Sequence, residues 1–128
     1  MSSRSAATAL VLCAWCLALA PRAPAADLQA RARAAFGKVM QAQAHGDYAQ
    51  ARALAVGLEH YALYPYFRYA DVRHRLHELP QAEVEQFLDD NDDSMLATTL
   101  RTAWLRELAR AGQWEMFRHF WRDRKSVV

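Results

Sequence analysis

The sequence predicts an all-α protein, built as an α-solenoid or superhelical stack of helical hairpins. Apolar residues recur at helical spacing in every segment after residue 25, and no run alternates apolar and polar residues as a strand does. Segments 44–48 and 110–114 nearly share a small-x-Gly-polar-aromatic turn pattern 66 residues apart, and Leu79-Pro80 lies midway. The resulting spacing of about 33 residues is close to that of stacking helix-turn-helix repeats. A simple helical bundle is the alternative.

The first two helices are expected within residues 27–58. The first runs from about Asp27 to Ala44, and Gly46 can end it in the left-handed conformation. Asp47 is a suitable N-cap for the second. The expected apolar faces are Leu28, Ala32, Ala35, Phe36, Val39 and Met40 in the first helix, and Tyr48, Ala51, Leu54, Ala55 and Leu58 in the second.

An aromatic tract around a proline, residues 63–70, marks the start of the third helix. Pro65 suits the first helical turn, where its missing N–H costs nothing. We expect this helix to reach about Glu78 and a fourth to start at Pro80. The residues expected to point inward are Tyr66, Tyr69, Ala70 and Leu76, followed by Val84, Phe87 and Leu88.

Two further helices follow an acidic break at residues 89–93. Ser94 caps the fifth helix, which ends at Gly112. The expected apolar faces are Leu96, Leu100, Ala103, Trp104 and Leu108, then Trp114, Phe117 and Trp121 in the sixth. The sequence stops within this last helix, so we expect Phe117, Phe120 and Trp121 to form an exposed apolar edge.

The first 25 residues have the pattern of a signal peptide. Arg4 precedes an uncharged apolar run over residues 6–20, and Ala23-Pro24-Ala25 offers small residues for cleavage before Ala26. A retained membrane anchor is the alternative, but a spanning helix needs roughly 20 apolar residues. Cys13 and Cys16 would be removed with the signal. An exported chain without cysteines is typical of the bacterial periplasm, where we expect this protein.

The predicted mature domain covers residues 26–122. Residues 123–128 have no helical pattern and resemble an in-frame translation of a sequencing adapter, so we expect a non-native tail. The full chain has 16 basic and 14 acidic residues; without Arg4 and Arg22 the balance is 14 to 14. A neutral domain argues against nucleic acid as a partner, since that requires a basic footprint.

Two clusters contain residue types that can bind metal ions. Asp89, Asn91 and Asp93 imitate the opening of a calcium loop, but Ser94 and Leu100 stand where glycine and a bidentate glutamate are needed. A solvated acidic linker is the simpler interpretation. His74 and His77 lie three apart on one expected helix, without further ligands. Arg73 precedes His74 and Arg75 follows it, so the segment suggests a basic face exposed to solvent. Glu78 is adjacent to His77 in the sequence and is expected to point away from it.

No catalytic motif accompanies these elements. Glycosidic cleavage needs a carboxylic acid with a raised pKa in an apolar cleft. The glutamates all lie in patterns typical of exposed helix surface: Glu59, Glu78, Glu83, Glu85, Glu107 and Glu115. Some of the aromatic rings could stack on sugars, although such stripes are usually core: Tyr61, Tyr64, Tyr66, Tyr69, Trp104, Trp114 and Trp121. We therefore identify no catalytic, cofactor-binding or metal-binding residue.

The tract Leu63-Tyr64-Pro65-Tyr66-Phe67-Arg68-Tyr69 resembles the N-terminal region of soluble lytic murein transglycosylases. Two later segments support the likeness: Glu85-Gln86-Phe87-Leu88-Asp89, and Arg106-Glu107-Leu108-Ala109-Arg110 followed by Trp114. The likeness covers most of residues 26–121.

The resemblance implies a periplasmic protein whose long superhelical domain precedes a lysozyme-like catalytic domain. In that family the catalytic domain cleaves between N-acetylmuramic acid and N-acetylglucosamine, leaving a 1,6-anhydro product. Its Glu-Ser and Gly-Leu-Met-Gln elements do not occur in this sequence. The implied role is a scaffold that works with peptidoglycan strands and with the remaining superhelical and catalytic domains of the same protein. A periplasmic interaction module of tetratricopeptide-like hairpins is the alternative.

Overall fold

A computed structural model describes residues 24–123 of the chain, which form six α-helices and no β-strand. The prediction of an all-α protein is therefore confirmed. The helices are α1 (Ala25–Ala44), α2 (Tyr48–Ala55), α3 (Tyr64–His74), α4 (Gln81–Asp90), α5 (Met95–Arg110) and α6 (Trp114–Asp123). Residues 1–23 of the expected signal peptide (1–25) and residues 124–128 of the expected tail (123–128) lie outside the described residues, whereas Ala25 begins α1 and Asp123 ends α6. None of these six helices is long and apolar enough to span a bilayer.

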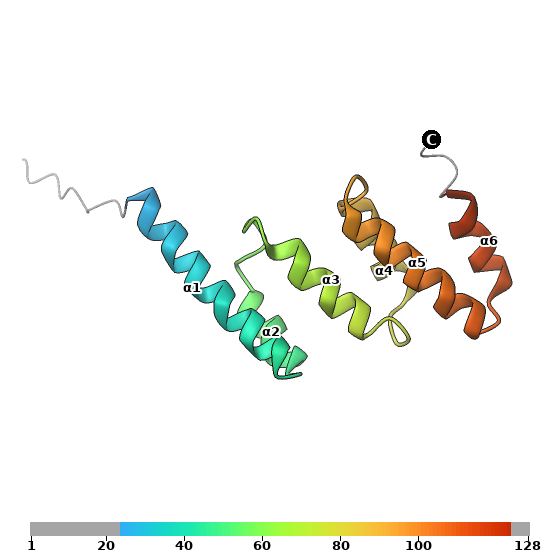
Figure 1. Cartoon of the computed structure of the whole chain (residues 1–128), viewed down its shortest axis with the longest axis horizontal. Helices are drawn as coiled ribbons and strands as arrows, with labels where there is room; N and C mark the ends of the chain where they lie inside the picture. Colours follow the sequence, from blue (N-terminus) through green and yellow to red (C-terminus); the bar gives the residue numbers. More distant parts are fainter. Residues whose placement is uncertain (1–23, 124–128) are drawn as a thin grey trace, which may run out of the picture.

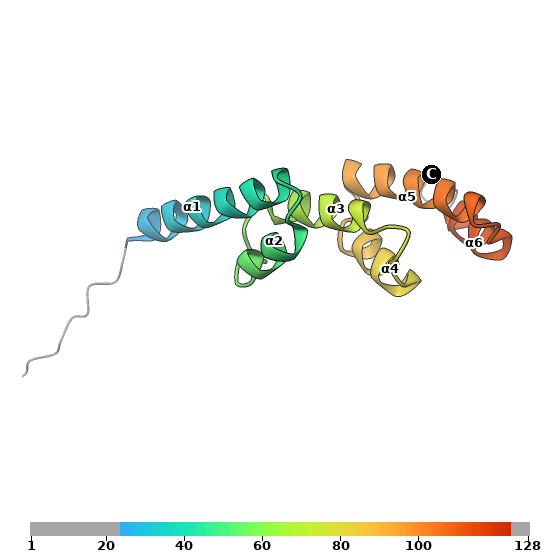
Figure 2. The ribbon, with the colours of Figure 1, turned by 90° about the horizontal axis from the view of Figure 1, so that it is seen from below.

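The helices follow one another along the long axis of an elongated structure (Figure 1). Seen after a quarter turn, α1, α3 and α5 lie in one row, and α2 and α4 lie beneath it (Figure 2). Each helix packs on a neighbour in sequence: α1 on α2, α3 on α4, and α5 on α6, while α3 also packs on α1 and α5. The described helices are therefore held together by contacts between the two rows, such as α1 with α2, and by contacts within the upper row, such as α3 with α5.

The buried side chains form two separate clusters, and α3 contributes to both. The N-terminal cluster consists of Phe36, Val39, Ala42, Ala51, Ala55 and Phe67. The larger C-terminal cluster consists of Val72, Leu76, Leu79, Val84, Phe87, Leu88, Ala97, Leu100, Ala103, Trp104, Leu105, Leu108 and Phe120. Within α3, Phe67 faces one cluster and Val72 the other, so this helix joins the two halves.

Local chemistry explains most helix boundaries. The His45–Asp47 turn after α1 contains Gly46 at φ 81°, and the Asp47 side chain accepts a hydrogen bond from the Gln50 backbone N–H at 3.0 Å. Ser94 Oγ accepts from the Ala97 N–H at 3.1 Å and caps α5. Pro65 lies in the first turn of α3. The predicted roles of these residues are confirmed.

Two helices end earlier than predicted. Helix α2 stops at Ala55, because Val56 leaves the helical region and Gly57 follows at φ 85°. Helix α3 stops at His74, and turns occupy the residues up to Leu79. Pro80 disfavours helical geometry at Leu79, the residue before it, so α3 does not continue directly into α4.

Several residues predicted to point inward are instead exposed. Leu28 and Met40 of α1, Leu54 of α2 and Tyr66 of α3 are all exposed, Tyr66 to 55%. Helical spacing shows which residues share one face of a helix, but it does not show where the neighbouring helices stop. The first turns of α1 have no partner among the described residues. At the other end Trp121 is exposed, as predicted. Phe120 is buried against α5, so its predicted exposure was wrong.

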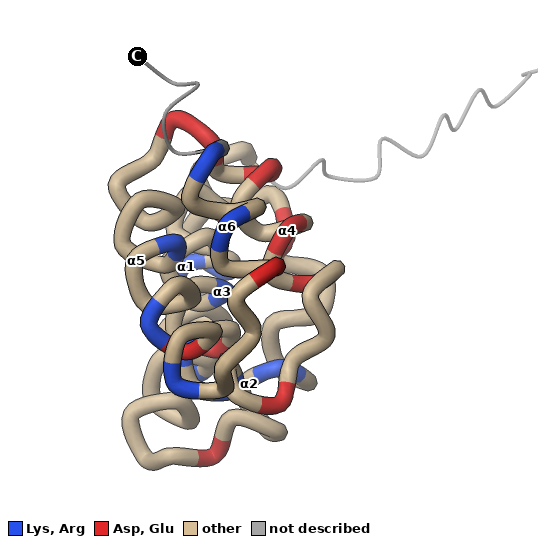
Figure 3. The backbone as a smooth tube through the Cα atoms, turned by 90° about the vertical axis from the view of Figure 1, so that its right-hand side faces the viewer, with Lys and Arg blue, Asp and Glu red and all other residues tan. Residues whose placement is uncertain are grey.

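Charge is unevenly shared between neighbouring helices. Helix α4 carries Glu83, Glu85, Asp89 and Asp90 and no Lys or Arg. Helix α5 carries Arg101, Arg106 and Arg110 with one acid, Glu107. The acidic segments of α4 and the basic segments of α5 lie on opposite sides of the structure when it is viewed along its long axis (Figure 3).

Candidate functional site

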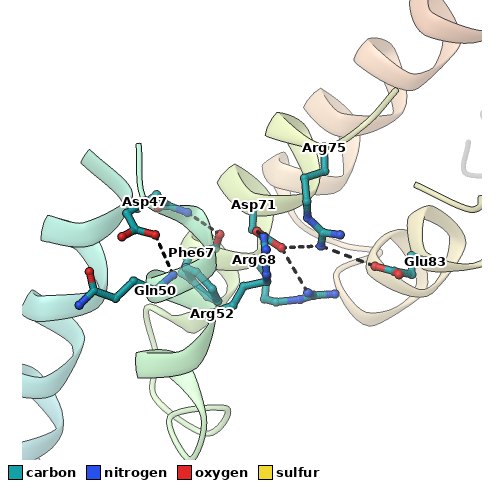
Figure 4. Close-up of polar contacts among 9 residues, drawn as sticks. Asp47, Gln50, Arg52, Phe67, Arg68, Asp71, Arg75 and Glu83 are labelled. Atoms are coloured by element: carbon teal, nitrogen blue, oxygen red, sulfur yellow. Dashed lines mark hydrogen bonds and ion pairs between the residues drawn. The ribbon is translucent and has the colours of Figure 1, made fainter. Parts of the chain in front are cut away.

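The most unusual polar group in the described chain is the carboxylate of Asp71, which is 0% exposed. Asp71 lies on α3 next to Val72, where the two apolar clusters meet. Arg75 Nη2 donates to its Oδ2 at 2.7 Å, and Arg52 Nη1 of α2 donates to its Oδ1 at 2.8 Å. Arg68 Nη1 lies 3.8 Å from Oδ2 (Figure 4). One buried anion is therefore surrounded by three guanidinium groups.

This network and a neighbouring hydrogen bond connect four helices. Besides Asp71, Arg75 Nη2 lies 3.7 Å from Glu83 Oε2 of α4. Gln43 of α1 donates from Nε2 to the Phe67 carbonyl oxygen at 3.3 Å. Figure 4 shows these contacts converging on α3 from both sides. Because they connect α1, α2 and α4 to α3, they fix how the two halves of the chain meet.

The same contacts shift the pKa values of Asp71 and Arg75. Burial by itself raises the pKa of the Asp71 carboxyl, but the hydrogen bonds from Arg75 and Arg52 outweigh it and hold that pKa below its ordinary value. The hydrogen bond to Asp71 raises the pKa of the Arg75 guanidinium. Asp71 is therefore a permanent carboxylate at neutral pH and unsuited to donate a proton.

Beside this network, the aromatic-proline tract lines a concavity of about 480 Å³ between the start of α3 and the end of α4. We call it the aromatic-proline pocket; its lining residues are Glu59, Tyr64, Pro65, Arg68, Phe87, Asp90 and Asn91. Arg68 belongs to both the pocket and the Asp71 network, so the buried carboxylate helps to hold a pocket side chain.

The pocket combines a ring with polar groups from two helices. Tyr64 is half-buried and tilts against Phe67 at a centroid distance of 5.6 Å; its pKa is raised, chiefly by burial. Asn91 Nδ2 donates to the Phe87 carbonyl oxygen at 2.9 Å. Asp90 Oδ1 accepts from Gln86 at 2.8 Å. Carboxylate and amide oxygens beside an aromatic ring can accept hydrogen bonds from sugar hydroxyls while the ring covers an apolar sugar face.

The glutamates do not form a proton-donating site. Glu59, Glu78 and Glu115 are exposed, while Glu83, Glu85 and Glu107 are half-buried, contrary to their predicted exposure. Glu59 Oε1 accepts from the Gly57 backbone N–H at 3.0 Å, and backbone hydrogen bonds lower the pKa of the Glu59 carboxyl. The pKa shift of Glu59, like that of Asp71, is opposite to the one that a glycosidase acid requires.

The histidine pair predicted on one helix is not brought together. Helix α3 ends at His74, whose ring stacks on Tyr48 of α2 with centroids 3.8 Å apart. His77 lies in the following turn, where its Nε2 is 3.0 Å from Glu78 Oε1, so the prediction that Glu78 points elsewhere was wrong. Arg75 faces Asp71 rather than solvent. Between residues 24 and 123, no three His, Cys, Asp or Glu residues are placed to hold a metal ion.

The acidic segment after α4 has local rather than ligating roles. Helix α4 ends at Asp90, and residues 91–94 form a turn in which the Ser94 N–H donates to the Asn91 carbonyl oxygen at 2.8 Å. Asp92 and Asp93 are exposed. Their negative charge just before α5 favours its N-terminus.

The aromatic candidates divide by exposure. Tyr61, Tyr64, Tyr69 and Trp104 are buried or half-buried, and each packs against a phenylalanine. Tyr66, Trp114 and Trp121 are exposed, to 55%, 58% and 40%, although both tryptophan rings contact Phe117. Asp71 was not predicted from the sequence as a site residue, although Arg68 and Arg75 at positions i−3 and i+4 indicate an ion-pair cluster.

The chain matches no protein-family model, no characterised protein and no solved structure.

Proposed function

We propose that this chain is the N-terminal scaffold of a periplasmic lytic transglycosylase and holds peptidoglycan strands for a catalytic domain elsewhere in the same protein. In this proposal the six helices are the opening of an α-superhelical domain. Bond cleavage between N-acetylmuramic acid and N-acetylglucosamine belongs to a C-terminal domain with the Glu-Ser and Gly-Leu-Met-Gln elements that this sequence lacks.

One observation carries the proposal. The tract that resembles the transglycosylase family begins α3 and contributes Tyr64, Pro65 and Arg68 to the aromatic-proline pocket. The same helix joins both apolar clusters and carries Asp71. The tract that resembles the family therefore begins the helix that joins the two apolar clusters, and it also lines part of the aromatic-proline pocket.

The electrostatics support a role in holding rather than cutting. The Asp71 and Glu59 carboxyls have lowered pKa values, and Asp71 is fully enclosed by its arginines. A scaffold needs groups that stay in one ionisation state and one geometry, and the buried network provides both. The open, polar pocket beside it offers acceptors for sugar hydroxyls.

Cosedimentation of the full chain with insoluble peptidoglycan tests this proposal. We expect binding to peptidoglycan above that to cellulose, and weaker binding for Asp90→Ala, which removes a pocket carboxylate. Asp93→Ala removes an exposed carboxylate from the same segment but does not alter the pocket lining, so it should bind like the unchanged chain. Equal recovery with peptidoglycan and cellulose would refute the proposal.

A periplasmic module that binds a protein partner through tetratricopeptide-like hairpins is the second candidate. It is favoured by the packing of α1 on α2, α3 on α4 and α5 on α6, with the odd-numbered helices in one row. The genomic sequence that follows the codon for Trp121 distinguishes the scaffold proposal from the interaction module. The scaffold proposal expects more helices and then the two catalytic elements, whereas the module expects only further repeats.

A further inference from the structure

A second concavity, of about 210 Å³, lies between α3 and α5 and has a different chemistry. We call it the arginine pocket: Arg73 comes from α3, and Arg106 and Arg110 come from α5, together with the apolar side chains of Leu76 and Ala103. It does not share a residue with the aromatic-proline pocket. Neither function considered above makes use of it.

The positive charge of this pocket is only partly compensated. Glu107 also lines it, and its Oε2 lies 3.6 Å from Arg110 Nη1. Within residues 24–123, neither Arg73 nor Arg106 has an ion-pair or hydrogen-bond partner. His77 also lines the pocket and contacts Glu78. Two free guanidinium groups thus converge from different helices, and guanidinium is the group best suited to a planar carboxylate.

The backbone around these arginines is firmly held. Leu76 and Ala103 belong to the C-terminal apolar cluster, and α3 packs on α5. Arg73 follows the buried Val72, and Arg106 follows the buried Leu105. The packing of α3 on α5 therefore fixes the separation of the backbone positions from which the two arginines extend, which lowers the cost of bringing both guanidinium groups to one oxyanion.

The adjoining surface argues for a peptide carboxylate. A neighbouring concavity of about 230 Å³ shares Leu76, His77 and Glu107 with the arginine pocket, and Trp104 lines it. The indole Nε1 of Trp104 is buried and lacks a hydrogen-bond partner in the described part of the chain. A phosphate ion would use only the arginines. A peptide end could place its carboxylate on Arg73 and Arg106 and a small apolar side chain on Leu76 and Ala103, while the preceding residue extends toward the neighbouring concavity beside Trp104.

We propose that the arginine pocket binds the C-terminal carboxylate of a short peptide whose last residue has a small apolar side chain. The unequal distribution of charge in Figure 3 would favour approach to the α5 side. This inference depends on the contacts of α3 and α5 and does not require the proposed glycan-holding role.

NMR titration of the full, isotopically labelled chain at low salt with N-acetyl-Ala-Ala tests the proposal. We expect shifts of the backbone amides around Arg73 and Arg106 and of the Trp104 indole N–H. N-acetyl-Ala-Ala-amide, which lacks the negative charge, should leave them unchanged, and added salt should weaken the binding. Inorganic phosphate should shift only the arginine signals.

The variant Arg73→Gln/Arg106→Gln should weaken peptide binding about tenfold, the loss expected for two exposed charge-assisted contacts. Arg31→Gln/Arg33→Gln makes the same charge change at exposed positions of α1 and should bind as before. Circular dichroism checks that each pair of substitutions keeps its helices; if the first pair does not, Arg106→Gln alone replaces it. Equal binding of the amide, equal Trp104 shifts with phosphate, or unaltered binding by the pocket variant would overturn the proposal.

Discussion

Arg52 of α2 donates a hydrogen bond at 2.8 Å to the carboxylate of Asp71, 19 residues later in α3. This contact crosses from the first helical hairpin to the next, at the junction of the two apolar clusters. Because Arg75 donates to the other carboxylate oxygen, Asp71 is held from both sides. The union of the two halves therefore depends on a buried charge and its arginines as well as on apolar packing.

Removing that charge should destabilise the chain strongly. We expect Asp71→Asn to lower the free energy of unfolding by about 3 kcal/mol, the range found when one partner of a buried ion pair is lost. Urea denaturation followed by circular dichroism measures this. Asp93→Asn, at an exposed position, should lose only the attraction between its charge and the α5 N-terminus, less than about 1 kcal/mol. Similar effects of the two variants would show that the network is not structural.

The same group predicts a pH dependence. The pKa of Asp71 in the folded chain lies below its ordinary value of 3.8, so in the window between the two values the unfolded chain binds a proton that the folded chain does not. The stabilisation is fully present above pH values near 4 and is lost as pH falls through the folded pKa. Urea midpoints measured from pH 6 downward should show this loss. In Asp71→Asn the decline should be smaller.

The cap of α5 should have a measurable effect. Ser94→Ala removes the side-chain acceptor of the Ala97 N–H and should lower the free energy of unfolding by about 1 kcal/mol. Thr98→Ala changes an exposed hydroxyl residue in the same turn that caps nothing, so it should be neutral or slightly stabilising. Thermal melts of both variants test the difference. A neutral Ser94→Ala would contradict the capping role.

Two glycines should respond in opposite directions to the same change. Gly46 has φ 81°, so Gly46→Ala forces a side chain into the left-handed region and should cost about 1 kcal/mol. Gly37 lies within α1, and a Cβ added there would meet nothing within 4 Å. Gly37→Ala should therefore stabilise the chain by about 0.5–1 kcal/mol. Denaturation midpoints that move in the same direction would contradict this assignment.

Capping and turn residues in the sequence predicted most helix starts and ends, whereas helical spacing predicted the burial of side chains less well. Gly46, Asp47 and Ser94 act through neighbours a few residues away, so their sequence context was sufficient. Tyr66 and Met40 are exposed because burial depends on which helices lie alongside, and their spacing contains no such information. Helix α3 ends at His74, before the predicted end near Glu78, without a glycine or proline at the boundary to signal it.

The candidate sites were also hard to predict, because they depend on which helices lie side by side. The Asp71 network joins residues 19 apart, and the arginine pocket joins α3 to α5. Neither arrangement forms a short motif. Only the aromatic-proline tract combined a recognisable sequence with a place in a concavity, because its residues are consecutive and begin one helix.

The central claim is that these helices hold glycan strands without cleaving them. Incubating the purified full chain with peptidoglycan and analysing the soluble fraction by mass spectrometry tests it most directly. We expect the chain to be recovered with the insoluble polymer and no 1,6-anhydro fragments to be released. Release of such fragments by the chain alone would contradict the claim.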